Sequence, residues 1–139
     1  MPDVSRTAKL VGPLVLWTLF VWASRIRNIW IDDELSTGGQ VLRTGFAIVF
    51  LTFAIAMAYR LYVGRGSELT PGDTRILAPF VAWTIGFWLV RGIGIIVDDH
   101  TTAFTIVHTA LMLVSIGIAL VASKALSMRS ISSSPVAAQ

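Results

Sequence analysis

Residues 13–33 read PLVLWTLFVWASRIRNIWIDD, and residues 79–99 read PFVAWTIGFWLVRGIGIIVDD. The two stretches align without a gap at a constant shift of 66 residues. The identical pairs are Pro13/Pro79, Val15/Val81, Trp17/Trp83, Thr18/Thr84, Trp22/Trp88, Arg25/Arg91, Ile29/Ile95, Asp32/Asp98 and Asp33/Asp99. Each copy predicts an apolar helix that carries one arginine and ends at a pair of aspartates.

The composition is typical of an integral membrane protein. Of the 139 residues, 55% are hydrophobic and 14% are charged, whereas soluble domains carry about 25% charged residues. The mean hydropathy is +0.74, and the apolar runs reach the roughly 20 residues that a membrane-spanning helix needs. Cysteine is absent, which excludes disulfides, thiolate metal sites and a cysteine nucleophile.

Four membrane-spanning helices are predicted, at about residues 10–31, 41–59 (extending as far as 63), 76–97 and 103–123. Turn-forming residues at 32–40, 62–74 and 98–102 separate them. The first run is too long for a signal peptide and no small-residue cleavage site follows it, so we expect a retained helix. Pro13 is expected in the first turn of that helix, where its missing N–H is not needed.

The expected fold class is an all-α, four-transmembrane-helix bundle built from a tandem repeat. Residues 1–74 form the first two-helix unit with a cytoplasmic linker, and residues 75–123 form the second. Because each unit crosses the membrane twice, the two units point the same way, as a parallel repeat about an axis along the membrane normal. Residues 124–139, rich in Ser and Ala, are expected to form a disordered cytoplasmic tail.

Basic residues set the expected orientation in the cell membrane, because they are enriched on the cytoplasmic side. One side carries Arg6, Lys9, Arg60, Arg65, Arg75, Lys124 and Arg129. The other side carries Arg25, Arg27, Arg43 and Arg91. This seven-to-four split predicts cytoplasmic termini and outward-facing aspartate pairs.

The duplicated residues fall on one helix face, which we call the seam. Steps of four and three residues connect its members, which are Thr18, Trp22, Arg25, Ile29 and Asp32 in one copy and Thr84, Trp88, Arg91, Ile95 and Asp98 in the other. We expect the two seams to face each other across a shared outer cleft. The candidate binding residues are Arg25, Arg91, Asp32, Asp98, Trp22, Trp88 and His108.

An arginine at a helix centre costs about 2.5–3.5 kcal/mol to insert, so intramembrane charge points to function. The expected partners of Arg25 are an aspartate of the other repeat, a backbone carbonyl, a lipid phosphate or a bound anion. A plain membrane anchor is the simpler interpretation, since arginines extend towards head groups. The tryptophans at 17, 22, 83 and 88 are interpreted as packing rather than as a cofactor pocket.

No cofactor or metal is expected. Asp98, Asp99, His100 and His108 have poor metal-ligand spacing, and carboxylates beside a helix start are explained by capping. Only His108 lies in a predicted helix, so a bis-histidine haem site has no second ligand.

The sequence leaves three function classes to weigh. All eight acidic residues lie in loops or at helix ends, which disfavours a cation-coupled transporter and leaves an anion or neutral-solute transporter that uses Arg25 and Arg91. An enzyme would need a nucleophile, base or metal placed together, and no such set is found. The favoured interpretation is an accessory membrane protein that binds lipid, partner transmembrane helices or a second copy of itself, and no nucleic acid. Gly86, Gly92, Gly94 and Gly117 are expected to allow close helix packing.

Overall fold

The computed structural model describes residues 4–64 and 68–132, and its regular structure there is helical. The helices follow one another as α1 (Val4–Ile31), α2 (Thr37–Val63), α3 (Pro71–Val97) and α4 (Thr102–Ser132). Each is long and apolar enough to cross a membrane. The prediction of an all-α chain with four membrane-capable helices is confirmed.

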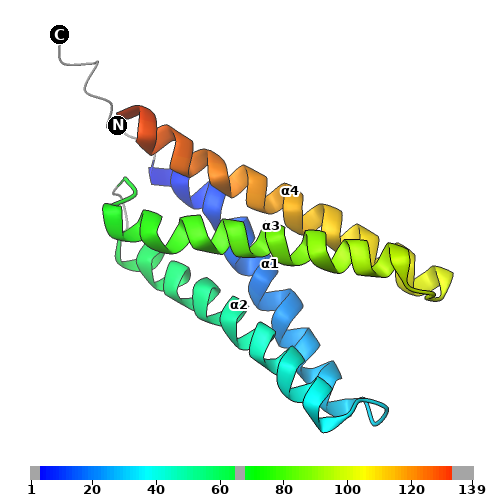
Figure 1. Cartoon of the computed structure of the whole chain (residues 1–139). Helices are drawn as coiled ribbons and strands as arrows, with labels where there is room; N and C mark the ends of the chain where they lie inside the picture. Colours follow the sequence, from blue (N-terminus) through cyan, green and yellow to red (C-terminus); the bar gives the residue numbers. More distant parts are fainter. Residues whose placement is uncertain (1–3, 65–67, 133–139) are drawn as a thin grey trace.

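The helices form two hairpins, α1–α2 and α3–α4 (Figure 1). α1 also packs against α4, and α2 packs against α3. The backbones of α1 and α3 lie diagonally across the bundle, because no Cα of α1 comes within 8 Å of one in α3 in the described ranges. The seams therefore meet only through their side chains.

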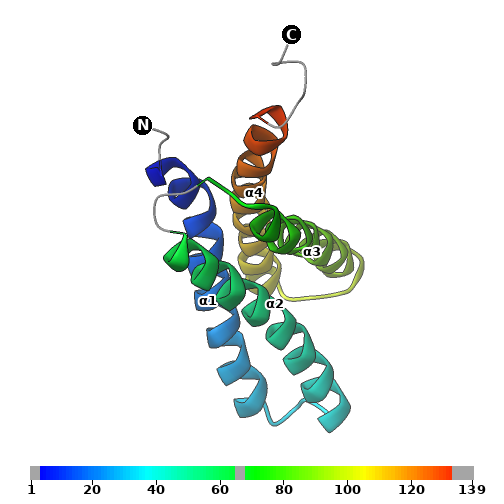
Figure 2. The same ribbon diagram turned by 90° about the vertical axis from the view of Figure 1, so that its left-hand side faces the viewer.

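The two hairpins are not parallel along their whole length. Figure 1 shows them close together where α2 ends and α3 begins, and diverging towards the loops at 32–36 and 98–101. Figure 2 shows the same divergence from the side. We call the end with these two loops the open end, and the other the closed end.

Side-chain caps explain why the middle helices start earlier than predicted. The Ser36 hydroxyl accepts a hydrogen bond from the Gly39 amide at 3.2 Å, so α2 includes the two glycines. Thr70 and Asp73 bond reciprocally to each other's backbone amides, and Pro71 is the first residue of α3. Such a capping box satisfies two amides that have no partner within the helix.

Helix α1 begins at Val4, so the expectation that Pro13 lies in the first turn is wrong. Pro13 lies inside α1, and Pro79 holds the aligned position inside α3. Each proline removes one intrahelical hydrogen bond. Both prolines are exposed, so the core packing on the opposite face of the helix is not interrupted.

Helix α4 continues to Ser132, well past the predicted end at residue 123. Residues 124–132 are therefore helical, where the sequence predicted the start of a disordered tail. The cause is packing: Ala125 is buried, Leu126 packs against the core, and Arg129 Nη1 donates to Thr74 Oγ1 at 2.7 Å. Residues 133–139 of the predicted tail lie outside the described residues.

The core lies between the four helices and includes the inner part of both seams. Its largest fully buried side chains include Trp88, Phe50, Phe80, Leu14 and Met57. The seam positions Thr18, Trp22, Ile29, Thr84, Trp88 and Ile95 are also buried. Large apolar side chains cover the outer surface of every helix, as expected of helices that face lipid.

A polar cluster, which we call the clasp, joins the hairpins at the closed end. Arg60 Nε at the end of α2 lies 2.5 Å from Asp73 Oδ1 at the start of α3. Arg60 Nη2 also donates to Thr70 Oγ1 at 2.9 Å. Asp73 Oδ2 accepts from the Thr70 amide at 2.7 Å and from its hydroxyl at 2.8 Å. Every charge in the clasp therefore has partners.

Candidate functional site

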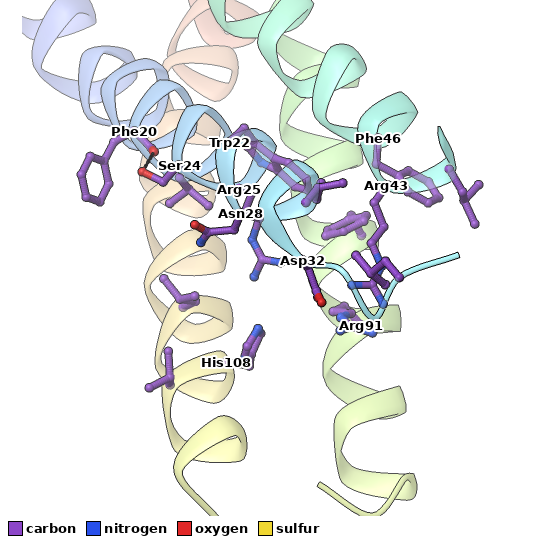
Figure 3. A pocket seen from close by; sticks show the side chains of 17 residues that line it. Phe20, Trp22, Ser24, Arg25, Asn28, Asp32, Arg43, Phe46, Arg91 and His108 are labelled. Carbon is purple, nitrogen blue, oxygen red and sulfur yellow. Dashed lines mark hydrogen bonds between the residues drawn. The ribbon is translucent and has the colours of Figure 1, made fainter. Parts of the chain in front are cut away.

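A pocket of about 560 Å³ lies between the diverging hairpins in the open half of the bundle. All four helices contribute to it, together with Leu35 of the first loop (Figure 3). Its polar lining is Ser24, Arg25, Asn28, Asp32, Arg43, Arg91 and His108. Its apolar lining is Phe20, Val21, Trp22, Ile29, Leu35, Leu42, Phe46, Phe87, Val107 and Leu111.

Arg25 of α1 lies between tryptophans of both seams. Its guanidinium carbon is 5.7 Å from the Trp22 ring centre and 5.5 Å from the Trp88 ring centre. A cation over an aromatic face gains about 0.5–2 kcal/mol, more when water is excluded. The two rings therefore hold this charge at the pocket, and no carboxylate among the described residues pairs with its N–H donors.

Two further arginines approach the same pocket from other helices. Arg91 of α3 is half-buried and Arg43 of α2 is exposed, and both line the pocket with Arg25. Figure 3 shows the three side chains converging from α1, α2 and α3. Across residues 4–64 and 68–132, none of the three guanidinium groups lies within 4.0 Å of a carboxylate oxygen. Asp32 lines the pocket without forming such a pair.

His108 brings the fourth helix to the pocket. Its Nδ1 lies 2.9 Å from the Phe104 carbonyl oxygen, which can only accept, so Nδ1 carries the proton. The imidazole also stacks on the Phe104 ring at 3.8 Å between ring centres. This anchoring leaves Nε2 as the ring atom available to a ligand.

An aromatic cluster closes the pocket on the side of the closed end. Trp22 stacks on Phe50 at 4.2 Å between ring centres, and Phe87 meets Trp22 edge-on at 5.2 Å and Phe50 at 5.1 Å. Phe50 is fully buried. These ring contacts form the wall of the pocket on this side, since Trp22 and Phe87 line it and Phe50 does not.

Of the seven binding residues predicted from the sequence, Trp22, Arg25, Asp32, Arg91 and His108 line the pocket. Trp88 lies behind the lining, where it supports Arg25. Asp98 is exposed and does not line the pocket. The expected pairing of Arg25 with an aspartate of the other repeat is not found among the described residues; the charge lies against tryptophan rings instead.

Sequence reasoning missed Arg43, which was considered only as a topology signal. Its counterpart at the 66-residue shift is Thr109, so the internal alignment could not single it out. The available signal was an arginine within the apolar helix α2, at the open end where Arg25 and Arg91 also lie. Recognising it requires knowing that α2 packs beside α3.

The glycines expected to allow close helix packing differ from one another. A Cβ at Gly92 would overlap Met112 Sδ, so the Met112 side chain of α4 packs directly on α3 beside Arg91. A Cβ at Gly86, Gly94 or Gly117 would meet no atom within 4 Å. The expectation therefore holds at Gly92 and is wrong for the other three within the bundle.

The described residues contain no group of three or more His, Cys, Asp or Glu side chains close enough to hold a metal ion. In the second acidic loop, His100 Nδ1 lies 3.0 Å from the Asp98 carbonyl oxygen, and its ring stacks on Phe104. The loop residues are thus engaged in local structure.

Comparison with protein-family models, with curated proteins and with solved structures finds no match. The site is therefore interpreted from its own geometry.

Proposed function

We propose that this chain is a multi-pass membrane protein that binds an anionic membrane component in the pocket between its hairpins. The observation that carries the proposal is the convergence of three guanidinium groups, from three helices, on one pocket without a paired carboxylate in the described ranges. Like charges repel strongly where water is excluded. A bound anion would relieve that repulsion and satisfy the N–H donors.

In the proposed arrangement the four helices span the cell membrane, with both termini in the cytoplasm and the open end facing outward. The hydropathy of the helices and the seven-to-four distribution of basic residues support this orientation. Duplication of a two-helix unit accounts for the aligned residues in α1 and α3. The substitutions Asp33→Cys and Asp99→Cys test the orientation. A membrane-impermeant thiol reagent should label these cysteines from outside intact cells. Labelling only after permeabilisation would contradict the proposed orientation.

The biological role that fits best is that of an accessory protein, which holds its ligand for a partner membrane protein or for a second copy of itself. The closed aromatic cluster below the pocket favours binding over passage. Anion transport through Arg25 and Arg91 remains the alternative, and its signature is flux. Proteoliposomes that carry the protein and release a trapped anion, with release lost in Arg91→Ala, would favour transport over the accessory role.

Lipid analysis of the purified protein tests the binding proposal. We expect protein extracted in mild detergent to retain anionic lipid in excess of its share in the source membrane. Arg43→Gln and Arg91→Gln should lose that excess, whereas Arg27→Gln should keep it, because Arg27 is exposed on α1 and does not line the pocket. Retained lipid that mirrors the membrane composition in every variant would contradict the proposal.

A further inference from the structure

The charges that line the pocket do not balance. Three guanidinium groups and one carboxylate line it, which leaves an excess of two positive charges. The carboxylate of Asp32 is exposed and lies at the rim, where α1 ends. A ligand that complements this lining carries two negative charges.

The donors also come from different directions. Arg25, Arg43 and Arg91 reach the pocket from α1, α2 and α3 (Figure 3). A planar carboxylate presents two oxygens in one plane, whereas a terminal phosphate presents three oxygens around a tetrahedral centre. Guanidinium forks bind phosphate oxygens in pairs, so three arginines around one centre fit a terminal phosphate better than a carboxylate.

The flank of the pocket between α1 and α4 is apolar and open. Closer to the closed end, Trp17 Nε1 of α1 donates to Ser115 Oγ of α4 at 2.9 Å. Beyond that bond, Phe20 of α1 and Val107 of α4 line the pocket while 68% and 55% exposed. In a membrane these two side chains meet acyl chains, so a lipid tail can lie there while its head group is inside.

We propose that the ligand is a lipid with a terminal phosphate monoester, whose phosphate is held by Arg25, Arg43 and Arg91 and whose tail leaves between α1 and α4. This rests on the function proposed above and narrows its ligand class. A terminal phosphate monoester carries a charge of about −1.5 to −2 at neutral pH, which matches the excess. A phosphodiester head group carries one negative charge, and a choline or ethanolamine group adds a cation that the arginines repel.

The test compares phosphate lipids that share the same acyl chains. The full-length protein is placed in nanodiscs of phosphatidylcholine that contain a small fraction of phosphatidic acid, phosphatidylglycerol or neither. Bound lipid is counted by native mass spectrometry, and the fluorescence of the tryptophans beside Arg25 is followed in parallel. Glycerol phosphate and inorganic phosphate, added to the phosphatidylcholine sample, provide the arm without a tail.

We expect phosphatidic acid to bind about tenfold more tightly than phosphatidylglycerol, and glycerol phosphate to bind at least tenfold more weakly than phosphatidic acid. Arg43→Gln and Arg91→Gln should each remove most of the preference for phosphatidic acid, and Arg27→Gln should keep it. The comparison between lipids is made on the wild-type protein. The measured preference for phosphatidic acid therefore does not depend on how well a variant folds.

Equal binding of phosphatidic acid and phosphatidylglycerol would overturn the phosphate monoester but leave the proposed function standing. Binding of glycerol phosphate as tight as that of phosphatidic acid would overturn the lipid as ligand and favour a soluble anion. No preference for either anionic lipid over phosphatidylcholine would overturn both this inference and the proposed function.

Discussion

The two ends of the bundle use arginine in opposite ways. At the closed end, Arg60 is paired with Asp73 and bonded to Thr70, and the contact joins α2 to α3. At the open end, Arg25, Arg43 and Arg91 line one pocket, and no carboxylate pairs with them in the described ranges. The charge of Arg60 is satisfied by a carboxylate within the fold. The described carboxylates do not pair with the open-end arginines, and we therefore propose a ligand for them.

The largest expected effect on stability is at the clasp. Asp73→Ala removes the N3 side chain of the capping box, which contributes about 1 kcal/mol, and leaves Arg60 with only its hydrogen bond to Thr70. We expect a loss of about 2 kcal/mol in the free energy of unfolding, measured by chemical denaturation in detergent.

Glu68→Ala is the matched control, because Glu68 is an exposed carboxylate in the same connection. It should change stability by less than about 0.5 kcal/mol. Equal effects of the two substitutions would mean that the clasp does not hold the closed end together.

A smaller loss is expected where α3 and α4 pack together beside the pocket. Gly92→Ala places a Cβ against Met112 Sδ. Because the flexible Met112 side chain can move aside, we expect a loss of about 1 kcal/mol, the low end for overpacking. Thermal unfolding in detergent measures it. Gly94→Ala, which meets nothing within 4 Å, should be neutral or slightly stabilising. Met112→Ala in the Gly92→Ala background should recover part of the loss; failure to recover it would place the strain elsewhere.

An effect on stability of similar size is expected at two tryptophans, Trp17 and Trp83, that align at the 66-residue shift. Trp17 Nε1 donates to Ser115 Oγ, whereas Trp83 Nε1 is buried and finds no partner in the described part of the chain. The position that aligns with Ser115 is Val49 of α2. Val49 directly precedes Phe50, and Trp83 contacts the rings of Phe46 and Phe50.

Ser115→Val should therefore destabilise the protein by about 1–2 kcal/mol, the cost of an unsatisfied buried donor. Val49→Ser should supply the missing acceptor and stabilise it by about 0.5–1 kcal/mol. Denaturant midpoints at constant slope measure both. A destabilising Val49→Ser would show that α2 does not present this position to Trp83.

The smallest effect on stability is expected in the pocket itself. Arg43→Gln removes one of three like charges and breaks no ion pair in the described ranges, so without ligand its free energy of unfolding should stay within about 0.5 kcal/mol of wild type. A loss as large as that of Asp73→Ala would mean that Arg43 has a structural role, and would remove the contrast between the two ends.

Much of the fold could be predicted from the sequence, because the patterns that determine the helices are local in the sequence. Apolar runs of spanning length predicted all four helices. Steps of four and three identified the face of α1 and α3 on which the apolar and threonine residues are buried. The helix ends were less well predicted. Capping by Ser36 and by Thr70 with Asp73 overrode the glycines and the proline near those ends, and packing of Ala125 and Leu126 extended α4.

The residues of the site could be predicted only in part from the sequence. Arg25, Arg91 and His108 stood out as charged or titratable side chains within apolar helices. Arg43 did not, because the 66-residue alignment gives it no counterpart and because its place beside the pocket depends on the packing of α2 against α3. Whether Arg25 paired with an aspartate or lay on tryptophan rings was likewise a question of geometry between helices.

The most direct test of the proposed binding site measures how much a bound anionic lipid stabilises the folded protein. It compares the wild type with one variant at the closed end and one at the open end. A ligand at about 100 times its Kd adds about 2.7 kcal/mol to the folded state. We predict that phosphatidic acid raises the unfolding free energy of the wild type and of Asp73→Ala by the same amount, although the latter starts lower. Arg91→Gln, with its native clasp, should gain little or nothing. An equal gain in Arg91→Gln and the wild type would contradict the assignment of the open-end arginines to a ligand.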